Sequence, residues 1–181
     1  MINREIIRNK IVQLTYAYYL NGNKNIDTAE KELFFSLSKA YDLYNHLLSL
    51  IVAVTKEAQR RLEVTQGRAK REGTAEPSQK FAYNRFAIQL QENKALNEFI
   101  GNQKTNWADT PVPGQLFETI EQSEIYKEYM ASGEDTYDAD RELWRKLYKN
   151  FIQENADLDN VLEDQSLYWN DDKEIVDTFV L

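Results

Sequence analysis

The sequence predicts an all-α fold. Its 181 residues include only six glycines and three prolines, so signals that end helices are sparse along the chain. Apolar residues recur at intervals of three and four through most of the chain, which is the spacing that places them on one face of a helix. With 42% hydrophobic and 12% aromatic residues, the chain can bury one good core or two small ones.

Three helices are expected within residues 1–64, where they form a minimal bundle. The first runs from about residue 3 to residue 20 and ends at an Asn-Gly-Asn turn, whose residues tolerate a left-handed backbone. The second begins at Asp27, which together with Glu30 matches a capping box. The third extends from residue 40 to residue 62 and carries a long apolar face that requires another helix to cover it.

Residues 65–80 are predicted to be an exposed linker, because they have almost no apolar content and include two glycines and a proline. Residues 81–181 are predicted to form an acidic helical region. A strongly amphipathic helix in this region opens at Asp138 or Asp140. Two apolar ridges follow, formed by Leu143, Leu147 and Phe151 and by Trp144, Tyr148 and Ile152. The last four residues are apolar in character and lack a cap, so we expect either a shortened C-terminus or a partner chain there.

The composition excludes most enzyme classes. The chain has no cysteine and one histidine, His46, so thiol nucleophiles, Ser-His-Asp systems and structural zinc sites lack their residues. Glycine patterns that cradle phosphates are absent, and the acidic clusters lack the spacing of a calcium-binding loop. We therefore expect a non-enzymatic protein with no cofactor and no metal. The absence of a signal peptide and of a membrane-spanning stretch predicts a cytoplasmic location.

Charge is divided unevenly along the chain. Residues 1–80 contain 13 Lys and Arg against 9 Asp and Glu, whereas residues 81–181 contain 9 against 21. A basic front half favours an anionic partner, and an acidic back half favours either solvation or a basic partner. A further hypothesis from this division is that the acidic half contacts the basic first helix and inhibits it.

The first predicted helix carries the candidate binding residues. At 100° per residue, one flank carries arginines and aromatic side chains beside an apolar face formed by Ile7, Ile11, Leu14 and Tyr18. Such a flank can hold a phosphate and stack an unpaired base, as in the recognition of single-stranded RNA. The predicted RNA-binding residues are Arg4, Arg8, Lys10, Tyr16 and Tyr19. The alternative is that the arginines lie over the edge of the core and the tyrosines pack.

Residues 3–18, NREIIRNKIVQLTYAY, resemble the opening helix of the NusB family of bacterial transcription antitermination factors. In that family, arginines precede an apolar-Gln-x-x-Tyr pattern. Here Arg4 and Arg8 fall on arginine positions of the family, while Val12-Gln13 and Tyr16 match the pattern. The resemblance implies an RNA-binding adaptor that binds boxA-type RNA with a small-subunit ribosomal protein and acts on the transcription elongation complex.

A second and weaker match runs from Leu143 to Asp177, which is similar to the middle helices of the family. The two matches leave roughly residues 65–135 as an acidic helical insertion, so the resemblance implies the N-terminal portion of a longer, insertion-bearing member. Glu5 stands where the family has a further basic residue, which predicts weaker RNA binding than the family norm.

A second functional class stays open on the sequence. It is a helical scaffold for protein interactions that does not bind RNA and whose acidic half docks a basic partner. The RNA-binding interpretation predicts that Arg4, Arg8 and Lys10 are exposed near one another. The scaffold interpretation predicts that the guanidinium groups of these arginines are paired with carboxylates of the same chain.

Overall fold

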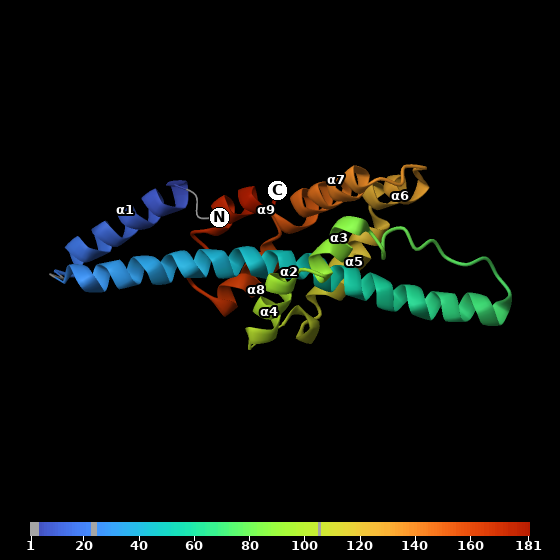
Figure 1. Ribbon diagram of the computed structural model, residues 1–181, viewed down its shortest axis with the longest axis horizontal. Coiled ribbons are helices and arrows are strands. Elements are labelled where there is room, and N and C mark those ends of the chain that lie inside the picture. Colours follow the sequence, from blue (N-terminus) through green and yellow to red (C-terminus); the bar gives the residue numbers. More distant parts are fainter. Residues whose placement is uncertain (1–3, 23–24, 105) are drawn as a thin grey trace. The chain divides into compact units, whose positions relative to one another are not determined.

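The computed structural model describes residues 4–22, 25–104 and 106–181, which contain helices and no strand (Figure 1). The predicted all-α class is confirmed. The chain folds as two compact units: unit 1 comprises residues 1–45 and 156–180, and unit 2 comprises residues 46–155 with Leu181. One helix, α2 (Ile26–Glu72), contributes residues to both units. None of the helices in the described residues combines the length and the apolar character needed to cross a bilayer.

The structure corrects the three-helix bundle predicted for residues 1–64. The second and third predicted helices, together with the first half of the predicted linker, form the single 47-residue helix α2. This helix ends at Gly73, whose φ of 66° is left-handed, and the Thr74 amide donates to the Ala69 carbonyl at 3.0 Å. That pattern is a Schellman motif, in which glycine adopts the left-handed backbone without a steric penalty. The extended segment therefore begins after Gly73 and not at residue 65.

Unit 1 is built from two long helices and two short ones. The long pair, α1 (Arg4–Leu20) and the first part of α2, forms a hairpin (Figure 1). The short helices are α8 (Ala156–Gln165) and α9 (Lys173–Val180). Asn25 precedes α2, and its side chain accepts from the Asp27 amide at 3.0 Å, so the cap is Asn25 and not the predicted Asp27. The predicted start of the first helix at residue 3 lies outside the described residues.

The core of unit 1 joins segments from both ends of the chain. Trp169, which is 7% exposed, donates from its indole Nε1 to the Lys39 carbonyl at 3.0 Å. The apolar side chains buried in this unit are Ile6, Leu37, Ala40, Leu43, Leu158, Leu162 and Val176. Because residues of α8 and α9 supply part of this core, the predicted boundary at residue 64 does not separate the units of the structure.

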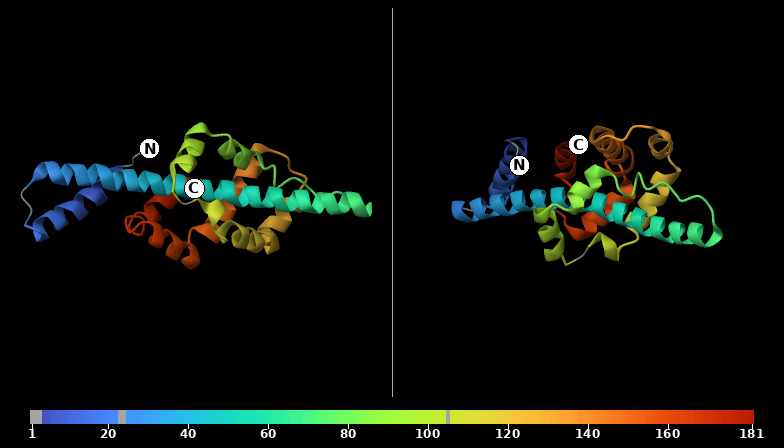
Figure 2. Two further views of the ribbon diagram at one scale, coloured as in Figure 1. Left: turned by 90° about the horizontal axis from the view of Figure 1, so that it is seen from below. Right: turned by 45° about the vertical axis from the view of Figure 1, so that its right-hand side comes forward.

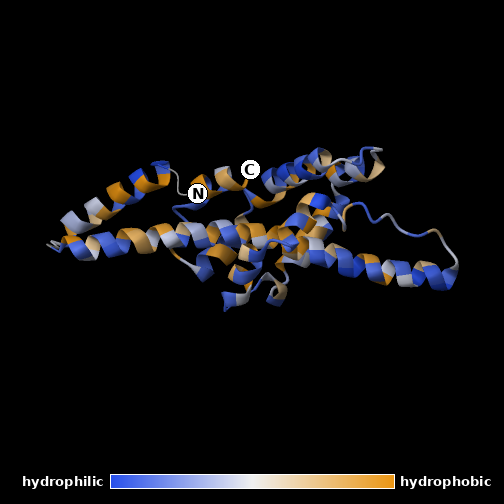
Figure 3. Ribbon diagram, in the orientation of Figure 1, coloured by the Kyte–Doolittle hydropathy of each residue, from blue (hydrophilic) through white to orange (hydrophobic). Residues whose placement is uncertain are grey.

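Unit 2 surrounds the central part of α2 with the remaining helices, which two further views show (Figure 2). They are α3 (Arg85–Gln91), α4 (Lys94–Asn102), the 3-10 turn η1 (Trp107–Asp109), α5 (Val112–Gln122), α6 (Glu124–Ala131), α7 (Tyr137–Leu147) and the π-helical turn η2 (Tyr148–Ile152). Figure 3 shows an apolar central stretch of α2 and a largely hydrophilic C-terminal stretch. This contrast explains why the helix is mostly buried over residues 47–54 and mostly exposed toward its end.

The amphipathic helix predicted from residue 138 onward is present as α7 and η2. The predicted ridge residues are buried, except that Phe151 is half-buried. The helix is capped by Thr136, which accepts from the Ala139 amide at 3.2 Å, and not by Asp138 or Asp140. Asp140 is instead 4% exposed and accepts from the Tyr129 hydroxyl at 2.6 Å.

His46 gives the stability of unit 2 a pH dependence. Its ring is 3% exposed and stacks on Trp107 with 4.4 Å between ring centroids. Burial lowers the pKa of His46 from 6.5 to about 4. Below pH 6.5 the unfolded chain therefore binds a proton that the folded chain does not bind, and stability is lost as the pH falls toward 4.

Between pH 7 and pH 4.5, the wild-type chain is expected to lose about 2 kcal/mol more unfolding free energy than His46→Gln. Urea denaturation of both chains at the two pH values measures this difference, and carboxylates that titrate in the same range affect both chains alike. Equal losses in the two chains would show that His46 titrates normally in the folded state.

Candidate nucleic-acid interface

One stripe of α1 faces solvent along the whole helix. At 100° per residue its members fall within about 120° of one another, so they share one side of the helix. The stripe comprises Arg4, Arg8, Val12, Tyr16 and Tyr19, all of which are exposed. Four of the five predicted RNA-binding residues are therefore accessible on a common face.

The opposite side of α1 packs into unit 1, and it differs from the apolar face expected from the sequence. Ile6 and Lys10 are buried, at 5% and 4% exposure, whereas Ile11 is 46% exposed. Leu14 and Tyr18 are half-buried and line a cavity of about 270 Å³ between α1 and α2. The buried face of α1 therefore includes Lys10. A prediction from the apolar residues alone places this lysine at the surface.

Lys10 is not available as a phosphate ligand, which corrects its predicted role. Its Nζ lies 2.7 Å from Oδ1 of Asp172, and both side chains are 5% exposed. Burial raises the pKa of Asp172 above its ordinary value, while the hydrogen bond from Lys10 acts in the opposite direction. The next helix, α9, begins at Lys173, so the pair fixes the start of α9 against α1.

The acidic C-terminal segment therefore contacts the first helix, as the charge division suggested. The contact includes a second and longer hydrogen bond, from Nε2 of Gln13 to Oδ2 of Asp171 at 3.5 Å. Nothing in the local sequence pattern signals the burial of Asp172, because acidic residues are common at the solvated start of a helix. Its partner is separated from it by most of the chain, so only the tertiary structure reveals the pair.

Arg4 and Arg8 differ from Lys10 in their surroundings. Both are exposed, and within the described part of the chain neither forms an ion pair. An exposed guanidinium that keeps all its donors can bind a phosphate through two parallel hydrogen bonds. The arginines lie one helical turn apart, so they can contact two separate phosphates of one strand.

The aromatic end of the stripe is also open. Tyr16 is 66% exposed and Tyr19 is 80% exposed. Among the residues that the structure describes, neither ring stacks on another aromatic ring. Exposed rings of this kind offer platforms on which unpaired bases can stack. Because the stripe runs over 16 residues, it extends roughly 22 Å from Arg4 to Tyr19.

Exposed apolar side chains are concentrated in unit 1. On α2 they include Ile26 at 76%, Phe34 at 63% and Tyr41 at 51% exposure, and Leu167 beyond α8 is 77% exposed. Among the described residues, unit 2 contributes only Val64, Tyr83 and Tyr137 to the large exposed apolar side chains. At 100° per residue, Ile26, Phe34 and Tyr41 fall within about 80° of one another on α2, and exposed apolar side chains that share one side of a helix favour contact with another protein.

Comparison of the chain with models of known protein families, with curated proteins and with solved structures returns no match.

Proposed function

We propose that the chain is an RNA-binding adaptor of bacterial transcription antitermination that binds boxA-type single-stranded RNA through the exposed stripe of α1. The observation that carries the proposal is the position of Arg4 and Arg8. They are exposed and make no ion pair in the described residues, and they share a face with Tyr16 and Tyr19. This face belongs to the segment that resembles the opening helix of NusB proteins.

In this proposal the two ends of the stripe have different tasks. The arginines bind phosphates and set the register of the strand, and the tyrosines stack on unpaired bases. Lys10 acts indirectly: its buried pair with Asp172 holds the opposite side of α1 in unit 1. The stripe is thereby presented on a fixed support, which reduces the entropy lost when RNA binds.

A small-subunit ribosomal protein is the protein partner that the resemblance implies. The exposed apolar side chains of unit 1 support a protein contact on the same unit as the proposed RNA stripe. The acidic surplus of unit 1, with 7 Lys and Arg against 13 Asp and Glu, favours a basic partner. The same observation supports the second candidate function, a protein-binding scaffold without RNA, so RNA binding itself must be measured.

The test is a fluorescence-anisotropy titration of a labelled boxA-type RNA at several salt concentrations. In the double variant Arg4→Ala/Arg8→Ala, the slope of log affinity against log salt is expected to fall by about 1.4, because each phosphate contact with a single strand contributes about 0.7. The matched control is Lys70→Ala/Arg71→Ala, which removes two exposed cations from the end of α2.

The control variant is expected to keep the salt slope of the wild-type chain. If both double variants lose the same slope, the RNA is held by overall charge and not by the α1 stripe. If the wild-type chain binds no RNA, either alone or with the ribosomal protein, the scaffold function replaces the proposal.

A further inference from the structure

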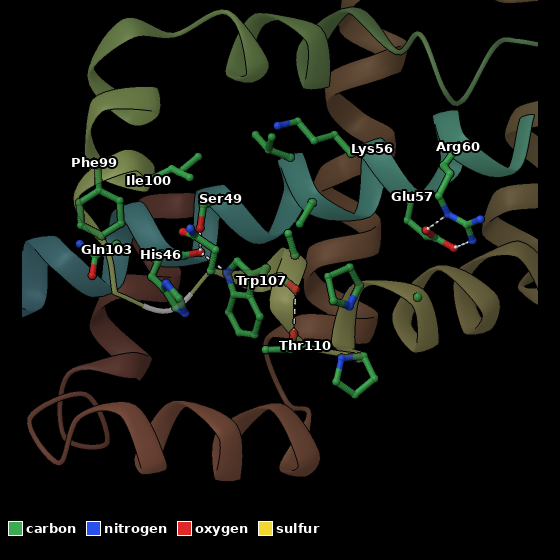
Figure 4. A pocket seen from close by; sticks show the side chains of 17 residues that line it. His46, Ser49, Lys56, Glu57, Arg60, Phe99, Ile100, Gln103, Trp107 and Thr110 are labelled. Carbon is green, nitrogen blue, oxygen red and sulfur yellow. Dashed lines mark hydrogen bonds and ion pairs between the residues drawn. The ribbon is translucent and has the colours of Figure 1, made fainter. Parts of the chain in front are cut away.

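A groove of about 340 Å³ is lined by residues of unit 2 alone (Figure 4). One wall is the face of α2 from His46 to Arg60, and the other is formed by the end of α4, by η1 and by the start of α5. Its volume is within the range of about 300–1,000 Å³ that is usual for pockets that bind small molecules.

One part of the groove is apolar and uncharged. The buried side chain of Trp107 stacks on His46, and the half-buried side chains of Phe99 and Ile100 lie on the same wall as Trp107. His46 adds no charge at neutral pH, because its burial lowers its pKa to about 4. This part fits the aromatic or alkyl body of a ligand.

The groove also contains a cation that is open to a ligand. Lys56 is exposed, and no ion pair in the described residues involves it. Its neighbour Glu57 is already occupied: Arg60 donates to both oxygens of this carboxylate at 2.8 Å, and Arg61 donates to one at 2.8 Å. Figure 4 shows the Lys56 side chain extending away from the Glu57 and Arg60 pair.

The charge of the lining selects the sign of the ligand. Lys56 and Arg60 are positive, Glu57 is negative, and the other lining residues are uncharged, so the groove carries one net positive charge in a chain of net charge −8. A monoanion matches one available ammonium group. A dianion such as a phosphate monoester would have to lie close to Glu57 without a second available cation.

We infer that this groove binds a small amphipathic carboxylate, with its apolar body against Phe99 and Ile100 and its carboxylate at Lys56. The inference is independent of RNA binding by α1, because it uses residues of unit 2 alone. It assigns the groove to one ligand class and predicts that amines and neutral amides of the same shape bind more weakly.

The experiment uses three probes of one shape: 4-phenylbutyrate, 4-phenylbutyramide and 4-phenylbutylamine. They are titrated into the ¹⁵N-labelled full chain, and the indole N–H signal of Trp107 is followed, since this group donates to the His46 carbonyl at 2.9 Å. For a ligand of this size, 4-phenylbutyrate is expected to bind with a Kd on the order of 1 mM. The amide and the amine are expected to bind at least about fivefold more weakly.

The matched variants are Lys56→Gln within the groove and Lys70→Gln, an exposed lysine of the same helix outside it. Lys56→Gln is expected to weaken 4-phenylbutyrate binding about fivefold and to remove the preference over the amide, whereas Lys70→Gln changes neither. The inference is overturned if no probe shifts the Trp107 signal at 10 mM, or if all three probes bind equally well to the wild-type chain.

Discussion

Lys10→Met is expected to lower the free energy of unfolding by about 3–5 kcal/mol, because it leaves Asp172 as a buried carboxylate without its cation. The pair is inaccessible, with both side chains 5% exposed and 2.7 Å between Nζ and Oδ1. The other oxygen, Oδ2, has no hydrogen-bond partner among the described residues, so no second donor compensates for the loss. Methionine keeps the length of the lysine stem, which limits the change to the loss of charge and hydrogen bonding.

Two controls separate the charge effect from packing. In Lys10→Met/Asp172→Asn both charges are removed, and most of the lost stability is expected to return, because a neutral amide is less costly to bury than an unpaired carboxylate. The deficit of Lys10→Met is also expected to shrink as the pH is lowered. Without Lys10 the pKa of Asp172 rises further above its ordinary value, and protonation then relieves the buried charge.

Urea denaturation at pH 7 and at pH 4.5 measures these differences. A loss below about 1 kcal/mol in Lys10→Met would mean that solvent reaches the pair and screens it, as in surface ion pairs. A double variant that is as unstable as Lys10→Met would assign the loss to packing around residue 10.

The helical character of the chain could be predicted because periodicity is a local property. The ridges between residues 143 and 152 were placed correctly for this reason. The continuity of α2 was missed, because Ser36, Ser38 and Lys39 interrupt the apolar pattern without breaking the helix. Ser36 and Ser38 donate to carbonyls three residues earlier, at 2.9 and 2.7 Å, so both hydroxyls are satisfied within it. Neither glycine nor proline occurs between Ile26 and Gln66.

The candidate site was predicted only in part, for a related reason. The angular position of Arg4, Arg8, Tyr16 and Tyr19 follows from helical geometry alone, and all four are exposed. The burial of Lys10 depends on Asp172, and no local rule connects residues so far apart in the sequence.

The distribution of charge over the folded units differs from its distribution along the sequence. The sequence separates a basic front half from an acidic back half, which favours an anionic partner for the front and, for the back, solvation, a basic partner or a contact with the first helix. In the structure, residues 156–180 belong to the same unit as residues 1–45, and this unit has six more acidic than basic residues. The exposed arginines of α1 are therefore a local group of positive charges on an acidic unit. An RNA strand that binds this unit is expected to bind at the α1 stripe.

The aromatic end of the stripe is expected to have a large effect on RNA affinity. Tyr16→Ala/Tyr19→Ala is expected to weaken binding of boxA-type RNA at least about thirtyfold, because stacking contributes about 1–3 kcal/mol per base. Both rings are exposed, so their removal leaves the core of unit 1 unchanged. The matched control is Tyr16→Phe/Tyr19→Phe, which keeps both stacking surfaces and removes only the hydroxyls.

The most direct test of the central claim is therefore the dissociation constant of one labelled boxA-type RNA for three chains at one salt concentration: wild type, Tyr16→Ala/Tyr19→Ala and Tyr16→Phe/Tyr19→Phe. The α1 stripe predicts that the wild-type and phenylalanine chains bind alike and that the alanine chain binds at least about thirtyfold more weakly. An alanine chain that binds this RNA as tightly as the wild type would contradict the assignment of RNA binding to α1.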